Sequence, residues 1–154
     1  MTDYQYFNKI KDLHLFEKSW YQIDFELANS IEEIILKNNS TLFNFQTLFI
    51  SSDVEQKEIL NPEITKSFSL SLGLIFIEKY QEGNICFANN PEIRPEFRQN
   101  FTAIDLLDYC CAVSYLLNNV LKINTDRIPV PNDSGLFWKL ADVGQRFRID
   151  EIKL

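Results

Sequence analysis

The sequence predicts one α+β domain, in which a small antiparallel sheet packs with three or more helices. The chain of 154 residues is 45% apolar, which is enough to build a single core. Apolar residues recur at helical spacing near 62–72, 103–121 and 134–148, and short apolar runs at 42–50 and 74–88 have the length of strands. Helices beside a small sheet define the α+β class. A single domain over the whole chain explains this pattern.

The N-terminal part, residues 1–40, is expected to be helical. Residues 3–20 mix aromatic and charged side chains, and Asp24 would cap a helix through about Lys37 that has one apolar face. The segment TLFNFQTLFI, residues 41–50, then places phenylalanines at period two, which favours a strand. The polar run SSDVEQKE that follows it predicts a loop.

Residues 61–98 are predicted to form a helix, a hairpin and a loop. Asn61 and Pro62 satisfy the preferences for an N-cap and a first helical position, and Gly73 supplies the usual stop. The run GLIFIEKYQEGNICFAN predicts two apolar strands around a polar turn. Because NNPEIRPEFRQN contains two prolines, it predicts a loop.

The most clearly marked helix covers residues 103–121. Thr102 and Asp105 form a capping pattern immediately before its long apolar run. Asp105, Asp108 and Asn119 mark the side that is expected to face solvent. The apolar stripe, which predicts that the helix is nearly buried, contains Leu106, Cys110, Val113, Leu117 and Val120.

The C-terminal segment DRIPVPNDSGLFWKLADVGQRF predicts an extended strap followed by a helix. Each proline disfavours helix at the residue before it, so Pro129 and Pro131 keep the strap extended. Asp133 would cap the helix over 134–148. Gly144 inside that helix lowers helix stability, and its presence therefore suggests a close approach of two backbones.

The charge and the terminal sequence exclude several classes. A net charge of −7 and a pI near 4.7 argue against a domain that holds nucleic acid by itself, because phosphate neutralisation needs surplus Lys and Arg. A nucleic-acid role would depend on a local patch or on an attached partner domain. The N-terminus lacks the regions of a signal peptide, and no apolar window approaches the ~18 residues of a membrane span. We expect a cytoplasmic protein with no membrane partner.

Catalytic and metal-binding patterns are weak, and no catalytic residue or metal ligand is predicted. His14 is the only histidine, and no cluster has the spacing of metal ligands. Three cysteines without CxxC spacing favour reduced thiols, and Cys110 and Cys111 are expected to act as small hydrophobes on a buried helix. Glycine-rich phosphate loops are missing. The set Asp53, Glu55 and Lys57 is similar to magnesium-holding sets of nucleases, but such triplets also occur by chance in polar loops.

The best candidates for nucleic-acid contact lie between 84 and 98. Arginine can contact guanine edges or phosphates, and asparagine can pair with adenine. The alternative is a solvated loop in which the arginines pair with Glu92 and Glu96. The candidate DNA-binding residues are Arg94, Arg98, Asn84, Asn89 and Asn90.

Four separate pieces of the chain resemble, in order and spacing, the C-terminal region of large restriction-modification DNA methyltransferases, including type ISP enzymes. That family carries F-x-P-x-D-I-L-D-Y-I-Y-A-V-L, then F-L-K-I-D-F-P-R-[IV]-P-x-P, then x-D-x-x-x-F-W-x-L and a glycine. NPEITKSFSLSLGLIF resembles the family's N-P-E-I and L-G-L-x-F, and TLFNF resembles its T-P-L-Y-L-Y. The matching residues downstream are Asp105, Leu107, Asp108, Tyr109, Ala112, Val113, Leu121, Lys122, Ile123, Arg127, Ile128, Pro129, Pro131, Asp133, Phe137, Trp138, Leu140 and Gly144.

The resemblance covers about 110 residues and implies a part of such an enzyme without its chemistry. The S-adenosylmethionine loop and the N-P-P-Y motif are missing from the sequence. The resemblance therefore implies a non-catalytic, C-terminal target-recognition domain that contacts DNA through a parent enzyme. S-adenosylmethionine is expected only on a separate methyltransferase domain, in the same or a neighbouring polypeptide. The chain departs from the family at two places: SYLLNN, residues 114–119, replaces a longer turn, and Asp126 replaces a proline.

Two interpretations of the whole chain remain. In the first, IPVP and FW form a structural clasp, in which Phe137 and Trp138 anchor against the long helix and Arg127 is a buried or capping partner. Recognition would then belong to the hairpin and the arginine-containing loop. In the second, the chain is an acidic protein–protein interaction module with no DNA role, which the net charge and the lack of a catalytic set favour.

Overall fold

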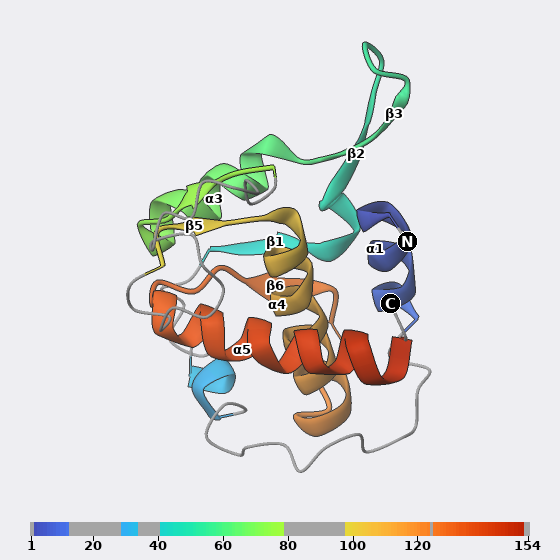
Figure 1. Cartoon of the computed structure of the whole chain (residues 1–154). Coiled ribbons are helices and arrows are strands. Elements are labelled where there is room, and N and C mark those ends of the chain that lie inside the picture. The colour runs from blue at the N-terminus through green and yellow to red at the C-terminus, as the bar shows by residue number, and fades with distance from the viewer. Residues whose placement is uncertain (1, 13–28, 34–40, 79–97, 124, 153–154) are drawn as a thin grey trace.

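The fold class is α+β, as the sequence predicts (Figure 1). Near the centre of Figure 1, the helices α4 and α5 cross each other, and strands lie above and behind them. No helix within the described residues is both long enough and apolar enough to span a membrane. The computed structural model describes residues 2–12, 29–33, 41–78, 98–123 and 125–152.

The strands form three separate pairs within the described residues. Two pairs are antiparallel and the third is parallel. The pairs are β1 (Leu42–Asn44) with β6 (Arg127–Pro129), β2 (Phe49–Ser52) with β3 (Lys57–Leu60), and β4 (Ile75–Phe76) with β5 (Asn100–Phe101).

The strand boundaries correct two predictions. The predicted strand over 42–50 is interrupted by a 3-10 turn at Phe45–Thr47, so that β1 and β2 have different partners. The predicted loop over 51–58 holds only at 53–56, where the chain turns, because its two ends belong to β2 and β3. The predicted 74–88 hairpin begins as strand β4, which pairs with β5 in parallel. Residues 79–88 lie outside the described residues, so the hairpin itself stays a prediction.

The first helices begin and end where local signals place them. α1 (Asp3–Lys11) has a capping box formed by Thr2 and Gln5. Residues 29–33 are helical, inside the predicted 24–37 helix, whose two ends lie outside the described residues. In α3 (Pro62–Leu72), the side chain of the N-cap Asn61 accepts a hydrogen bond from the Glu63 backbone, and Gly73 ends the helix with a φ of 69°. That left-handed conformation suits glycine.

The two long helices also match their predicted starts. α4 (Ala103–Tyr115) begins at a capping box in which Thr102 and Asp105 bond each other's backbone N–H, and a π-helical turn (Leu116–Val120) completes the predicted 103–121 segment. α5 (Ser134–Phe147) starts at the N-cap Asp133, and a second π-helical turn (Arg148–Ile152) follows it. The predicted α4 stripe is buried at Leu106, Cys110, Val113 and Leu117, which have no exposed area, and partly buried at Val120.

The core is centred on α4, and aromatic rings connect it to the other elements. The Tyr109 ring stacks on Phe137 of α5 at 5.3 Å between centroids, and Phe68 of α3 contacts both rings edge-on. Phe137 has no exposed area and Trp138 is 2% exposed, which confirms the predicted anchoring of α5. Aromatic pairs add to the free energy of burial at such distances.

The β2–β3 hairpin extends away from this core (Figure 1). At its base, Phe49 packs against the rings of Tyr4 and Phe7 of α1. Toward its end, Ser51 donates a 2.7 Å hydrogen bond to Glu58 on the opposite strand, and Val54 in the turn is 94% exposed. We call residues 49–60 the hairpin arm.

Candidate functional site

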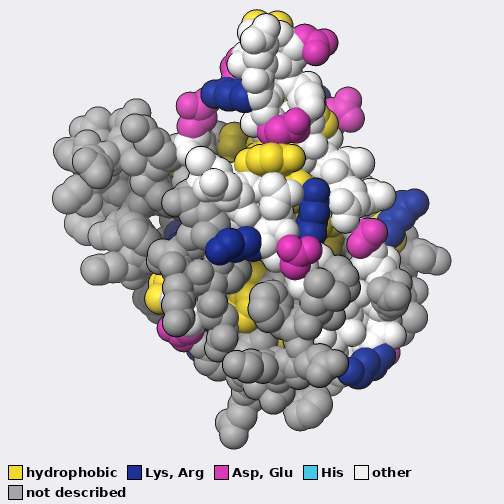
Figure 2. All heavy atoms as spheres, turned by 90° about the vertical axis from the view of Figure 1, so that its right-hand side faces the viewer, with side chains coloured by type: hydrophobic (Ala, Val, Ile, Leu, Met, Phe, Trp, Pro, Cys, Tyr) yellow, Lys and Arg dark blue, Asp and Glu magenta, His cyan; other side chains and the backbone are white. Residues whose placement is uncertain are grey.

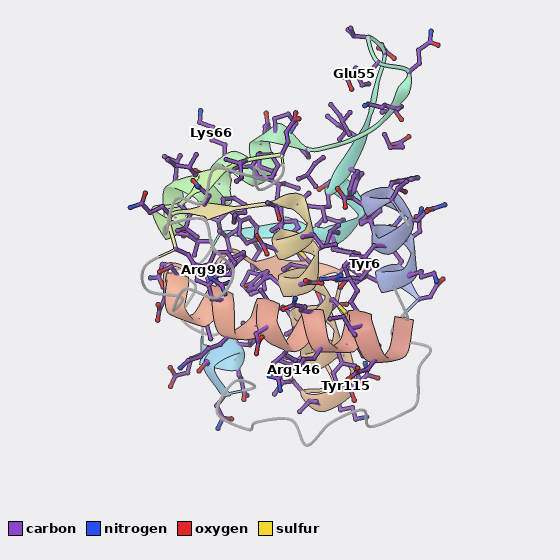
Figure 3. All side chains as sticks on the ribbon, viewed as in Figure 1. Tyr6, Glu55, Lys66, Arg98, Tyr115 and Arg146 are labelled. Atoms are coloured by element: carbon purple, nitrogen blue, oxygen red, sulfur yellow. The ribbon has the colours of Figure 1, made fainter. Side chains whose placement is uncertain are left out.

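The structure describes one of the five predicted DNA-binding residues. Arg98 is half-buried just before β5, and the centre of its guanidinium lies 4.6 Å from the centroid of the Trp138 ring. Figure 3 shows Arg98 near the first turns of α5. Residues Asn84, Asn89, Asn90 and Arg94 lie outside the described residues. Arg98 therefore packs on Trp138 in the folded chain, and its DNA contact stays a prediction.

The predicted clasp is present, with one correction. Strand β6 pairs with β1, and the Tyr109 hydroxyl donates a 2.6 Å hydrogen bond to the Pro129 carbonyl. The Ser71 hydroxyl donates a 2.6 Å hydrogen bond to the Pro131 carbonyl. The prediction that Arg127 is buried is wrong, because Arg127 lies at the exposed first position of β6, before the buried Ile128 and Pro129. The strap is held by these carbonyl groups and by its pairing with β1, which the Val130 N–H extends by donating to the Thr41 carbonyl at 2.8 Å.

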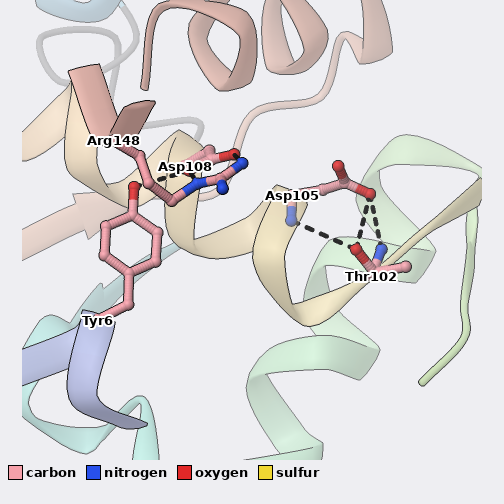
Figure 4. Close-up of polar contacts among 5 residues, drawn as sticks. All are labelled: Tyr6, Thr102, Asp105, Asp108 and Arg148. Carbon is pink, nitrogen blue, oxygen red and sulfur yellow. Dashed lines mark hydrogen bonds and ion pairs between the residues drawn. The ribbon is translucent and has the colours of Figure 1, made fainter. Parts of the chain in front are cut away.

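A buried polar cluster joins α1, α4 and the C-terminal end of α5. The Tyr6 hydroxyl donates a 2.7 Å hydrogen bond to Asp108 Oδ1. Arg148 binds the same carboxylate in a bidentate manner, with Nε 2.9 Å from Oδ1 and Nη2 3.1 Å from Oδ2 (Figure 4). Asp108 is only 3% exposed. The prediction that Asp108 faces solvent is therefore wrong.

The electrostatics of this cluster suit a structural role. Burial raises the pKa of Asp108, while the hydrogen bonds from Arg148 and Tyr6 act in the opposite direction. Burial lowers the pKa of Arg148, but the hydrogen bond and the charge of Asp108, together with Tyr6, outweigh burial and raise this pKa, so Arg148 stays charged. Burial and the nearby Cys111 and Asp108 raise the pKa of Tyr6. A carboxylate held by two donors and shielded from water is an internal connector between helices.

The described cysteines have the properties of core residues, as the sequence predicts. Cys110 and Cys111 are free thiols with no exposed area. Burial raises the pKa of both thiols well above the ordinary value. Since the thiolate is the nucleophile, these residues suit packing rather than catalysis. Cys86 and His14 lie outside the described residues.

Glu55 and Lys57, from the set that is similar to nuclease metal sites, lie exposed to solvent in the hairpin arm. Glu55 and Lys57 form an ion pair of 3.3 Å at the end of the arm, with more than half of each side chain exposed. Figure 3 shows Glu55 far from the body of the molecule. No group of three potential metal ligands occurs among the described residues. The arrangement of Glu55 and Lys57 is that of a solvated turn.

A cleft of about 280 Å³ opens beside the end of α1. Its apolar lining comes from Phe45 and Ile128, which are buried, and Lys11 and Asp126 supply charges of opposite sign. The remaining lining residues are polar: Gln46, Ser114 and Asn118. Sequence reasoning missed this cleft because its walls come from four separate segments. No spacing or periodicity connects these segments, so no sequence signal marks the cleft.

Comparison with known proteins adds no relative. The chain matches no family model, no curated protein and no solved structure with which it was compared.

Proposed function

We propose that this chain is a non-catalytic target-recognition domain of a restriction-modification DNA methyltransferase. It would act in the cytoplasm with a methyl-transferring domain in the same or a neighbouring polypeptide, and that domain would hold S-adenosylmethionine. The observation that supports the proposal is how the resembling segments pack. TLFNF pairs with RIPVP as β1 and β6, and Phe68, from the NPEI segment, contacts Tyr109 and Phe137.

The resembling positions also have specific packing roles. Asp108 binds Tyr6 and Arg148, and Gly144 lies against the Asp108 backbone. Other matching positions are exposed, among them Lys122, Arg127 and Asp133. The buried matches that contact one another support a common fold more directly than a common ligand.

Within this proposal, DNA is contacted by the segment that contains Arg94 and Arg98. The net charge of −7 opposes DNA binding by the isolated chain. We therefore expect weak binding, with a dissociation constant of about 10⁻⁴ to 10⁻⁶ M at physiological salt. The attached enzyme would supply the remaining phosphate contacts.

The test is fluorescence anisotropy with a labelled DNA duplex over a series of salt concentrations. Arg94→Ala should weaken binding and, if the contact is a phosphate, reduce the salt slope by about one unit. Lys66→Ala is the matched control, since Lys66 is exposed on the outer side of α3 (Figure 3). Equal affinities and slopes for the wild type, Arg94→Ala and Lys66→Ala would contradict the proposed contact.

A second candidate function, the acidic protein-interaction module, is favoured by the hairpin arm. Figure 2 shows a hydrophobic tip on the arm with acidic side chains around it. The tip is Val54, and the arm carries three carboxylates against one lysine, which already pairs with Glu55. A matching partner would present an apolar pocket with a basic rim.

These two functions differ in where a partner would touch the chain. A photo-crosslinking residue at position 54 should capture a basic protein in the producing cell, and Glu55→Lys should reduce the yield. The control places the same crosslinker at Leu70, which is 76% exposed on α3. Equal crosslinking at both positions, or none at position 54, would exclude the arm as a docking element. An adjacent gene for a methyltransferase without a C-terminal region would favour the recognition domain.

A further inference from the structure

The cleft beside α1 carries two opposite charges that do not neutralise each other. Lys11 is half-buried, and its ammonium lies 4.2 Å from the centroid of the Phe7 ring. Asp126 is exposed on the strap before β6. Both residues line the cleft, and neither forms an ion pair of 4.0 Å or less with the other or with another described residue. A ligand that fits here can therefore use a cation and an anion at once.

Hydrogen bonds fix the walls of the cleft. The Asn118 side chain donates to the Ser114 carbonyl at 2.8 Å and accepts from the Thr125 backbone at 3.2 Å. The Phe45 backbone N–H donates to the Asp126 carbonyl at 2.8 Å. Because these bonds hold α4, η2 (Phe45–Thr47) and the strap together before any ligand arrives, binding requires little ordering of the site.

The backbone at this cleft is also unusual. The α-helical winding of α4 changes to a π-helical turn at Leu116, between the two lining residues Ser114 and Asn118. Such turns are rare and often occur at functional sites. The change of winding therefore lies in one wall of the cleft, which the strap residue Asp126 also lines.

We propose that this cleft binds a free amino acid with an apolar side chain. Lys11 receives the ligand carboxylate, Asp126 receives the ligand ammonium group, and the side chain packs on Phe45 and Ile128. The volume of about 280 Å³ lies just below the ~300–1,000 Å³ of pockets for drug-sized ligands. A molecule of one amino acid suits that size. This site goes beyond the proposed recognition of DNA and is independent of it.

The experiment is a titration of the ¹⁵N-labelled full chain, followed by amide chemical shifts. The probes are L-leucine, N-acetyl-L-leucine, which lacks the ammonium group, and L-leucinamide, which lacks the carboxylate. L-leucine should bind in the millimolar range and shift the amides of Gln46 and Ser114. N-acetyl-L-leucine and L-leucinamide should each bind at least about tenfold more weakly than L-leucine, because each lacks one charge-assisted hydrogen bond.

Variants separate the two charges. Lys11→Ala should weaken the binding of L-leucine, whereas Lys11→Arg should restore it. In Lys11→Ala, N-acetyl-L-leucine should bind no more tightly than L-leucinamide. Asp126→Asn should abolish the preference for L-leucine over N-acetyl-L-leucine. Lys9→Ala and Asp53→Asn are the controls, since both residues are exposed away from the cleft. The proposal is overturned if L-leucine produces no amide shift at concentrations well above the millimolar range. It is also overturned if the three probes bind with equal affinity.

Discussion

Gly144 lies directly against the backbone of Asp108, so closely that a Cβ at position 144 would be 1.9 Å from the Asp108 carbonyl oxygen. Asp108 thus contributes to the contact between α4 and α5 through both its backbone and its side chain. Its backbone sets the distance between α4 and α5, and its side chain receives Arg148 from the turn after α5. The missing side chain at Gly144 permits the approach that brings Arg148 within reach.

Gly144→Ala should therefore destabilise the fold. An alanine would improve helix propensity by about 1 kcal/mol, but overpacking a rigid backbone contact typically costs about 1–3 kcal/mol or more. Gly135→Ala in the same helix is the control, because its Cβ would meet only the end of the Asp133 side chain, at 3.1 Å. Urea denaturation should show a lower free energy of unfolding for Gly144→Ala than for Gly135→Ala. Equal values would contradict the close contact.

The predictions that succeeded from sequence depend on near neighbours. The Asn61, Thr102 and Asp133 caps use bonds within two or three residues, so spacing alone identifies them. The helical pattern puts Asp108 on the solvent side, which is wrong because the partners that bury it are distant in the chain. Tyr6 and Arg148 are 102 and 40 residues away, and no periodicity connects such positions.

Strand pairing was harder to predict for the same reason. The phenylalanines of 42–50 alternate as in one strand, but the Asn44 side chain bonds the Gln46 backbone and starts a 3-10 turn. After that break β2 pairs with β3, whereas before it β1 pairs with β6, more than eighty residues later. The cleft beside Lys11 depends on this pairing, so it could not be derived from any single motif.

Arg148→Met should destabilise the fold because it leaves Asp108 charged and buried. Removing one partner from a buried ion pair costs about 3–5 kcal/mol. Arg146→Met is the control. Arg146 pairs with Asp142 at 3.1 Å on an exposed surface, where such pairs contribute about 0–1 kcal/mol. Thermal or urea melts should separate the two variants clearly. If both lost the same stability, Asp108 would have to be neutral or hydrated in the folded chain.

The pH dependence of stability should carry the signature of Asp108. Burial raises its pKa above the ordinary value of 3.8, so the folded state binds this proton more tightly than the unfolded state does. The resulting stability is fully present below 3.8 and is lost as the pH rises through the pKa of the folded state. Relative to Asp108→Asn, the chain with Asp108 should lose free energy of unfolding across that interval.

Asp3 requires a matched background for this measurement. Burial raises its pKa as well, against the opposing charge of Arg148, so its contribution has the same sign. Both proteins should therefore carry Asp3→Asn, and urea melts should be compared from acidic to neutral pH. A difference in stability that stays constant with pH, or that grows in favour of Asp108, would contradict the raised pKa.

The contact between Arg98 and Trp138 gives the last prediction, because it separates packing from recognition. Trp138 is 2% exposed, so Trp138→Ala should cost about 3–5 kcal/mol. Arg98→Ala should cost about 0.5–2 kcal/mol, since the guanidinium loses its ring contact. Arg98→Ala should cost less free energy of unfolding when Trp138 is already alanine than it does in the wild type. Urea melts of the wild type, the two single variants and the double variant measure this coupling. Strict additivity would mean that Arg98 does not stabilise the fold through Trp138. If coupling is found, any loss of DNA binding in Arg98→Ala has to be compared with Arg98→Lys, which keeps the charge, before it is assigned to recognition.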